Sequence, residues 1–365
     1  MSLRPRRGIH RGIAAAAALA ATALAVTGCS TAGGSPSDGQ SSGGSDSSYM
    51  VPTKDGALTV GFSNSFAGNA FRTQMIYELQ EAADANPDDV ADLIVTDANN
   101  SVDKQISDIN DLLSRGVDIL LIDAASETAL NSAVQRAWQQ GVLVVSFDNT
   151  VSSEHSITVN TDQTEFGKIG GEWLASKLSE GDTVVTLDGT SGSPVNDQRL
   201  EGAKKALDEA GVSIVGQADT DWDQAKGQSA AADLLSANPD VAGIYSQGGG
   251  PSLGAINAIE QRGGTLVPIT GEGYNGFLKK WKELKDSQGF ESIAPSNPPY
   301  LGAIALDYAI KAVRGEDPGQ APHVDLPVIT QDDLEDYVRP DLPDAFFLPT
   351  HLSEESIQKY YGSAS

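Results

Sequence analysis

The body of the chain alternates short apolar runs with longer stretches in which apolar residues recur at helical spacing. Continuous apolar runs of this length are typical of strands buried on both faces of a parallel sheet. The runs predict strands at 58–62, 93–96, 117–122 and 142–147. The intervening stretches predict helices over 71–85, over 106–113 with Gly116 past its end, and over 126–140 with Ser126 as N-cap. Strands that alternate with helices indicate an α/β fold built from doubly wound parallel sheets.

The same order of elements occurs a second time along the chain. A shift of 122 positions superposes Asp118 on Asp240, and a shift of 124 brings Asp148 onto Glu272. The second set predicts a strand at 241–245, a helix at 253–259 and a strand at 266–269. We therefore predict two similar domains in tandem, with chance likeness between generic strand–helix units as the alternative. Ligands of open α/β sheets bind beyond the carboxyl ends of the strands. Asp148 and Glu272 are thus expected to face one cleft from opposite walls.

The first 28 residues have the composition of a secretory signal. A basic start is followed by an apolar segment, Ile13 to Val26, that is too short for a membrane-spanning helix. The residues before Cys29, the one cysteine of the chain, resemble a bacterial lipobox, in which the cysteine is lipidated. We predict a signal peptide over 1–28, a lipid on Cys29 and a flexible Ser/Gly-rich tether over 29–56. The alternative is an ordinary signal peptide that is cleaved near a cysteine.

The charge of the chain limits its partners. The sequence has 24 basic and 50 acidic residues, for a net charge of −26. Without the four arginines of the signal, 24 − 4 = 20 basic residues remain, and the net charge falls to 20 − 50 = −30. Such a charge disfavours binding to nucleic acid or to anionic lipid surfaces. We expect no nucleic-acid partner, and we expect the lipid alone to hold the protein at the membrane.

Four segments of the body resemble the type I periplasmic sugar-binding proteins of the ribose- and galactofuranose-binding class. They are Val-Gly-Phe-Ser at 60–63 with Gly-Asn-Ala-Phe-Arg at 68–72, Val-Val-Ser-Phe-Asp-Asn at 144–149, Thr-Asp-Trp-Asp-Gln-Ala-Lys-Gly at 220–227, and the segment 247–255. The resemblance implies an N-terminal domain of 57–161 plus 296–325 and a C-terminal domain of 162–295 plus 326–365. It also implies a hinge of three strands between them.

The resemblance carries a set of ligand contacts onto this sequence. Phe71 and Trp222 would cover the two faces of a sugar ring, and Arg72 would donate to its oxygens. Asp148 and Glu272 would accept hydrogen bonds from its hydroxyl groups. The other candidates are Asn69, Asp123, Asn149, Asn196, Asp197, Gly248, Ser296 and Asn297. Alternatives stay open for four positions: Phe71 and Trp222 as packing residues, and Asp123 and Asp197 as helix caps.

Two departures from the family pattern bear on the ligand. The glycines at 248–250 stand where the family has Asn-Asp, and we expect them to leave backbone N–H groups and extra room. Arginines of the family are replaced by Asn149 and, beside Asn196, by Asp197. The resulting acidic cleft would favour a neutral sugar, a polyol or an aminated ligand over a phosphorylated or carboxylated one.

The pattern gives little support to an enzyme. The histidines that follow the signal, His155, His323 and His351, are too scattered to indicate a zinc site or a catalytic triad. We expect no cofactor and no metal. We predict a monomeric substrate-binding lipoprotein of an ABC importer, which captures a monosaccharide or polyol outside the cytoplasm and delivers it to a membrane permease. The alternative is a ligand-sensing receptor subunit coupled to a membrane signalling kinase.

Overall fold

Two parallel sheets organise the computed structural model, which describes residues 48–316 and 323–362. All of these residues belong to one compact part of the chain, residues 46–365. The predicted signal peptide and Cys29 lie outside the described residues. Within the described part of the chain, no helix is both long enough and apolar enough to cross a membrane.

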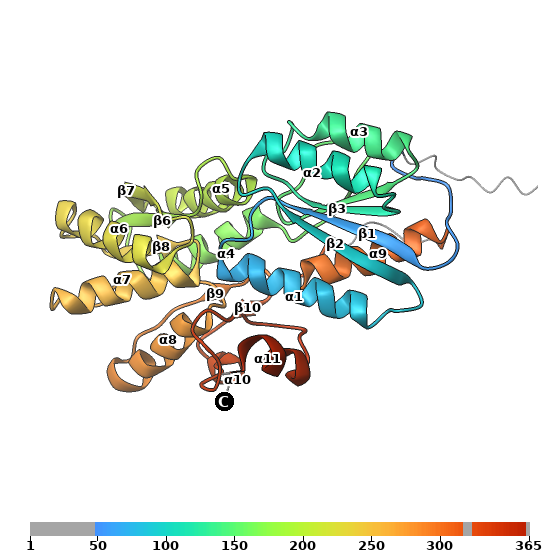
Figure 1. Cartoon of the computed structure of the whole chain (residues 1–365). Coiled ribbons are helices and arrows are strands. Elements are labelled where there is room, and N and C mark those ends of the chain that lie inside the picture. The colour runs from blue at the N-terminus through green and yellow to red at the C-terminus, as the bar shows by residue number, and fades with distance from the viewer. Residues whose placement is uncertain (1–47, 317–322, 363–365) are drawn as a thin grey trace, which may run out of the picture. The chain divides into compact units, whose positions relative to one another are not determined.

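The first sheet has five parallel strands in the order β2-β1-β3-β4-β5. Its strands are β1 (Leu58–Asn64), β2 (Val90–Asp97), β3 (Ile119–Asp123), β4 (Leu143–Phe147) and β5 (Ile157–Val159). The covering helices are α1 (Ala70–Asp84) and α9 (Leu301–Val313) on one face and α2 (Val102–Ser114) and α3 (Asn131–Gln139) on the other (Figure 1). We call this sheet with its four helices lobe one.

Two apolar cores explain why the strands of lobe one read as continuous apolar runs. Ile119 and Leu121 pack toward α1 and α9, whereas Leu120 and Ile122 pack toward α2 and α3. Successive side chains of a strand point to opposite faces, so a strand covered on both sides needs an apolar residue at each position. The predicted strands of this lobe are therefore present. The helix that we expected to follow Ser126 begins only at Asn131, because 127–130 forms a turn.

The second sheet repeats this arrangement on a smaller scale, with parallel strands in the order β7-β6-β8. Its strands are β6 (Thr183–Asp188), β7 (Ser213–Asp219) and β8 (Gly243–Ser246). Its helices are α4 (Gln163–Ser176), α5 (Pro194–Glu209), α6 (Gln224–Ala237), α7 (Gly249–Gln261) and α8 (Asn275–Gln288). The strand predicted at 266–269 is reduced to one parallel bridge between Ile269 and Ile244. We call this sheet with its helices and the C-terminal segment 328–362 lobe two.

The chain passes between the lobes three times. It leaves lobe one after β5, returns after β9 (Ala294–Pro295), and leaves again between His323 and β10 (Val328–Ile329). β9 and β10 pair antiparallel, and Asn160 bridges His323. The fold thus consists of two α/β lobes joined by three short connections. That these connections act as a hinge at the predicted domain boundaries stays a prediction.

The described end of the predicted tether is packed against lobe one. Lys54 N donates to Val313 O at 3.0 Å, and Trp138 Nε1 donates to Met50 O at 3.0 Å. The Arg314 guanidinium donates to the Lys54 and Gly56 carbonyls. The prediction of a flexible tether up to residue 56 is therefore wrong for 48–56, where backbone groups find partners in the fold.

Candidate functional site

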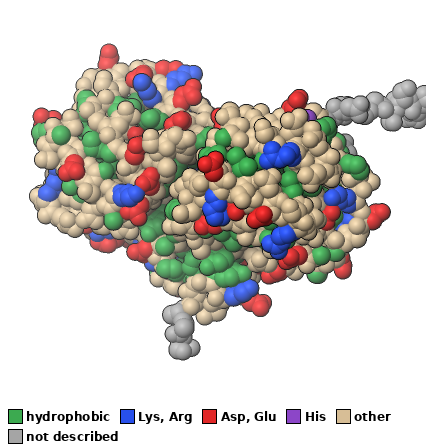
Figure 2. All heavy atoms as spheres, turned by 45° about the horizontal axis from the view of Figure 1, so that its top comes forward, with side chains coloured by type: hydrophobic (Ala, Val, Ile, Leu, Met, Phe, Trp, Pro, Cys, Tyr) green, Lys and Arg blue, Asp and Glu red, His purple; other side chains and the backbone are tan. Residues whose placement is uncertain are grey.

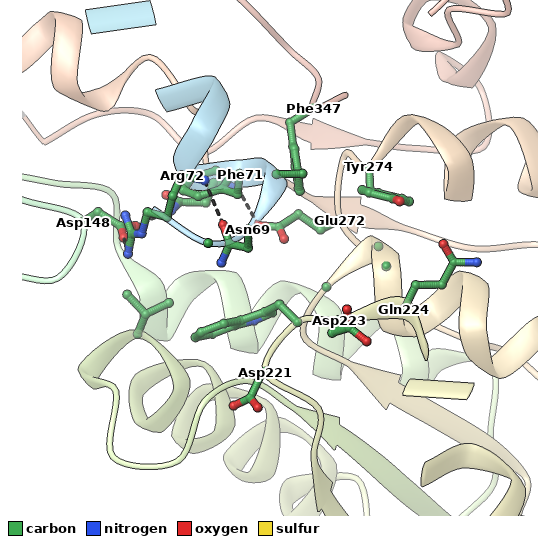
Figure 3. A pocket seen from close by; sticks show the side chains of 18 of the residues that line it. Asn69, Phe71, Arg72, Asp148, Asp221, Asp223, Gln224, Glu272, Tyr274 and Phe347 are labelled. Carbon is green, nitrogen blue, oxygen red and sulfur yellow. Dashed lines mark hydrogen bonds and ion pairs between the residues drawn. The ribbon is translucent and has the colours of Figure 1, made fainter. Parts of the chain in front are cut away.

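A cavity of about 480 Å³ lies where the carboxyl ends of both sheets meet. Nine of the predicted contact residues line it: Asn69, Phe71, Arg72, Asp148, Asn149, Trp222, Gly248, Glu272 and Asn297. Figure 3 shows Arg72 and Asp148 at one end of this cavity, and Glu272 and Tyr274 toward the other. The loops after β1 and β4 supply the wall from lobe one, and those after β7 and β8 supply much of the wall from lobe two.

Lobe one holds a buried arginine between two carboxylates. Arg72 Nη2 lies 2.5 Å from Asp148 Oδ2 and 3.1 Å from Asp123 Oδ1. Burial acts to lower the pKa of Arg72, but the two carboxylates more than offset it, so the pKa is raised and the guanidinium stays charged. Asn69, the N-cap of α1, fixes the start of the helix by accepting from Arg72 N at 2.8 Å. Asp148 is therefore already paired with a cation before any ligand arrives.

Asp123 supports this pair from behind the cavity. Its Oδ2 accepts from Ser65 Oγ at 2.5 Å, and its Oδ1 accepts from Asn149 Nδ2 at 2.9 Å. It is fully buried at the end of β3 and does not line the cavity. Asp123 does not cap α3, whose N-cap is Leu130, and its carboxylate instead orients Arg72 and Asn149. A direct contact of Asp123 with ligand stays a prediction.

Lobe two holds a matching pair that the sequence reading missed. Arg199, on α5 and only 2% exposed, lies with Nη2 3.2 Å from Glu272 Oε1. Its Nη1 donates to Gln247 O and its Nε to Gln163 Oε1, both at 2.8 Å. The guanidinium carbon sits 3.7 Å from the centroid of the Phe166 ring. Burial raises the pKa of Glu272, and Arg199 opposes that shift.

Asn297 joins the two pairs at the crossing from lobe two to lobe one. Its Nδ2 donates to Asp148 Oδ1 at 2.5 Å, and its backbone N donates to Glu272 Oε1 at 3.2 Å. Thr161 Oγ1 and Gln163 Nε2 in turn donate to its Oδ1. A single residue in the connection that follows β9 thus fixes the spacing of the two matched carboxylates.

Arg199 corrects the charge predicted for the cleft. Arg199, two residues after Asp197, lines the cavity and is a cation that the charge prediction did not count. Asp197 lies in the first turn of α5, whose N-cap is Ser193, so it neither lines the cavity nor caps the helix. Asn196 also stays outside the cavity, where its Oδ1 accepts from Gly189 N at 2.7 Å.

Ser296 has a positioning contact instead of a place in the cavity wall. Its Oγ accepts from Gly273 N at 3.0 Å and donates to Ala294 O at 3.1 Å. Because Gly273 follows Glu272 directly, this hydroxyl fixes the backbone next to the carboxylate of lobe two.

Trp222 occupies the space that the glycines were expected to leave open. It has a φ of 55° and lies over Gly189 and Gly248. A Cβ built on Gly189 would come within 2.1 Å of the indole, and one built on Gly248 within 2.8 Å. Of the other glycines in the run, Gly249 packs against Tyr274 in the same way. The extra room predicted at 248–250 is therefore wrong: these glycines allow the aromatic wall to approach the backbone.

Aromatic rings from distant segments complete the wall. Phe71 meets Phe347 edge-on with ring centroids 5.3 Å apart, and Phe347 meets Tyr274 at 5.5 Å. Tyr274 and Phe347 line the cavity but were missed, as were Asp221, Asp223 and Gln224. No motif in the sequence connects Phe347 with Phe71, because they are far apart along the chain and meet only through packing.

The arrangement suits reversible capture of a polyhydroxylated molecule. Carboxylates, amides and guanidinium groups present fixed acceptors and donors, and the rings present apolar faces. Among the residues that the structure describes, no cluster of three His, Cys, Asp or Glu side chains could hold a metal ion.

Comparison with known proteins identifies relatives over most of the chain. Residues 60–317 match the family model described as a periplasmic binding protein domain. The ribose import binding protein of Salmonella typhimurium is 30% identical over 238 residues, which cover 65% of this chain and 79% of that protein. The xylitol-binding protein of Mycolicibacterium smegmatis is 25% identical over 248 residues, covering 67% and 70%. A solved ABC transporter solute-binding protein from Mycobacterium smegmatis with bound glycerol has a TM-score of 0.69 at 25% identity, covering 80% of this chain and 100% of that one.

Proposed function

The chain belongs to the periplasmic binding protein family, and on that premise we propose that it captures a small neutral sugar or polyol for an ABC importer. The family consists of solute-binding proteins that work outside the cytoplasm. Its relatives here include a ribose import binding protein and a xylitol-binding protein. Capture by such a protein requires a cavity that closes around the solute, with no chemical step.

The network around Asn297 is the observation that carries this proposal. One side chain and its backbone N–H connect Asp148 of lobe one with Glu272 of lobe two, and each carboxylate is paired with an arginine. A sugar or polyol has adjacent hydroxyl groups that both donate and accept. Such a molecule can bond to guanidinium and carboxylate at once, which a simple anion or cation cannot do.

The expected neutrality of the ligand now rests on paired charges. Arg72 faces Asp123 and Asp148, and Arg199 faces Glu272, so neither cation is left uncompensated at the cavity. An anionic ligand would compete with these carboxylates for the same guanidinium groups. On the face seen in Figure 2, basic side chains are scattered among carboxylates and form no single positive patch.

The membrane arrangement extends the same proposal. Lipidated Cys29 would hold the protein outside the cytoplasm, and the closed, ligand-bound monomer would dock on the permease subunits of an importer. None of the described features favours the sensing alternative over transport.

A ligand screen tests the proposed function. The purified protein without its signal peptide should show a raised thermal midpoint with at least one compound among D-ribose, other pentoses, hexoses, xylitol and glycerol. Titration calorimetry should then give one site per chain. A negatively charged sugar phosphate serves as the matched control and should bind more weakly than its neutral parent. Failure of every neutral sugar and polyol to bind would overturn the proposal.

A further inference from the structure

The C-terminal strap, residues 344–361, lies beyond the family match, which ends at residue 317. It is built onto lobe two. Phe346, Leu352 and Ile357 are buried in the same apolar core as Trp281 of α8. Leu348 N donates to Gly273 O at 2.7 Å. The strap is therefore packed into lobe two next to Glu272, although the family model does not include the strap.

The strap also forms hydrogen bonds and a ring contact with helix α1 of lobe one. Gln74 makes a two-way pair with the backbone of Phe347: Nε2 donates to its carbonyl at 3.0 Å, and Oε1 accepts from its N–H at 2.8 Å. One turn later, Glu78 accepts from Thr350 Oγ1 at 2.6 Å and from His351 N at 3.1 Å. Tyr360 stacks on Tyr77 with ring centroids 3.9 Å apart, at the far end of the strap.

The contacts of the strap position Phe347 in the cavity wall. Its backbone is bonded to Gln74 and forms an antiparallel bridge with Tyr274. The residue is 9% exposed, and its ring contacts Phe71 of lobe one and Tyr274 of lobe two and lies beside Glu272 in the view of Figure 3. The backbone bonds hold the Cα of Phe347 at the cavity wall, and the contacts with Phe71 and Tyr274 limit the rotation of its ring.

We infer that Phe347 is a specificity-determining residue of the cavity, supplied by the strap and positioned by Gln74. The inference rests on the proposed function and goes beyond it by naming what limits the ligand. The ring forms part of the cavity wall beside Glu272 and presents C–H groups there. It favours a compact sugar or polyol with an apolar edge at that end and disfavours one that carries an additional polar substituent.

Three variants test the inference with D-ribose, a hexose, xylitol and glycerol as probes. Phe347→Ala should weaken the compound that the wild type binds best by about tenfold or more, from lost apolar burial. It should weaken the larger probes less, so that the ranking of affinities changes. Gln74→Met removes both bonds to the Phe347 backbone and should change the ranking in the same direction. Phe347→Leu keeps apolar volume and guards against simple unfolding of the alanine variant.

Tyr360→Leu is the matched control, since it loosens the same strap at a stacking contact outside the cavity. It should lower the thermal midpoint and leave the ranking as in the wild type. If the ranking is unchanged in both Phe347 variants, or changes equally in Tyr360→Leu, the inference is overturned while the proposed function stands. If the wild type binds none of the probes, both the proposed function and the inference are overturned.

Discussion

Asp148 and Glu272 each hold an arginine of their own lobe, so neither carboxylate is an isolated acceptor that waits for a ligand. Burial raises the pKa of Glu272, and the paired Arg199 opposes that rise. Pairing also orients the guanidinium groups, whose remaining N–H groups can donate to the ligand. At this scale the site is a set of compensated charges: Arg72 has two carboxylate partners, whereas removing Arg199 would leave Glu272 buried without its cation.

Asp148→Asn should weaken binding of the true ligand by about tenfold or more, because a bond to a charged group contributes on the order of 1.5–3 kcal/mol. Arg72 keeps Asp123 as a partner in this variant, so the fold should persist. Calorimetry measures the dissociation constant. Asp118→Asn is the control: this carboxylate pairs with Lys54, and Asp118 lies just before β3, away from its carboxyl end. Equal affinities for wild type and Asp148→Asn would refute the assigned role.

Gly189→Ala should displace Trp222, since the added Cβ would meet the indole at 2.1 Å. We expect weaker ligand binding, with a change in tryptophan fluorescence as an independent sign that a ring has moved. Gly181→Ala tests the same substitution at a glycine with open space around it, although its φ of 92° adds local strain. Unaltered affinity in Gly189→Ala would mean that the position of Trp222 does not matter for binding.

Helix α1 is the element through which the two lobes and the strap meet. Its first turn carries Phe71 and Arg72 into the cavity, and the next turns carry Gln74 and Glu78 to the strap. Glu78 is buried there, and burial is the largest cause that raises its pKa to about 7. Neighbouring Glu81 adds to the shift, and hydrogen bonds from Thr350, Gln74 and His351 oppose it. The strap contact is therefore expected to depend on pH.

The folded-state pKa of Glu78 lies above its ordinary value of 4.5, so folding favours the protonated form. The stability that this contributes is fully present below the ordinary pKa and is lost as the pH rises through about 7. Glu78→Gln should remove this loss, which is on the order of 3 kcal/mol. Urea unfolding at about pH 5 and about pH 8 measures the difference. Glu81→Gln, on the half-buried neighbour that accepts from Ser353 N, is the control. Parallel pH profiles for wild type and Glu78→Gln would contradict the buried-acid account.

We expect the whole molecule to bind by bringing two walls together around three short connections. Phe71 belongs to lobe one and Trp222 to lobe two, and both line one cavity. Ser193 Oγ donates to Asn149 Oδ1 at 3.0 Å across the same cleft. A ligand shifts the balance toward closure only by as much as it binds the closed form better. Contacts that reach both lobes supply that difference.

Trp222→Ala should cost affinity and also reduce the compaction that ligand produces, because one of the two walls loses its ring. Small-angle scattering of wild type and variant, with and without saturating ligand, measures the compaction. A wild type that does not compact, or a variant that compacts as fully, would show that Trp222 is a packing residue and not part of the closing wall.

Cys29→Ser should release the protein from the membrane into the surrounding medium or periplasm, since no other anchor is expected. Fractionation of cells that express each form, followed by immunoblotting, measures the distribution. A serine variant that still needs detergent for its release would contradict lipidation at this position.

The sequence by itself determined the strands of lobe one, but not the start of α3 or the bridge that stands in place of the strand predicted at 266–269. Hydrophobic periodicity indicates which face of an element is buried. A strand whose sheet is covered on both sides appears in the sequence as a continuous apolar run, such as 117–122. The repeat then placed Asp148 and Glu272 at equivalent strand ends, and both line the cavity. These features depend on neighbours along the chain, so local pattern is enough to find them.

Only the tertiary structure decided how the charges pair and what fills the cavity. Arg199 reaches Glu272 through the packing of α5 on lobe two, and Phe347 reaches Phe71 through the strap. The sequence predicted open space at the glycines 248–250, but Trp222 and Tyr274 pack against them. Such contacts join residues tens to hundreds of positions apart, and their partners are fixed by how the elements pack in three dimensions, which local spacing does not encode.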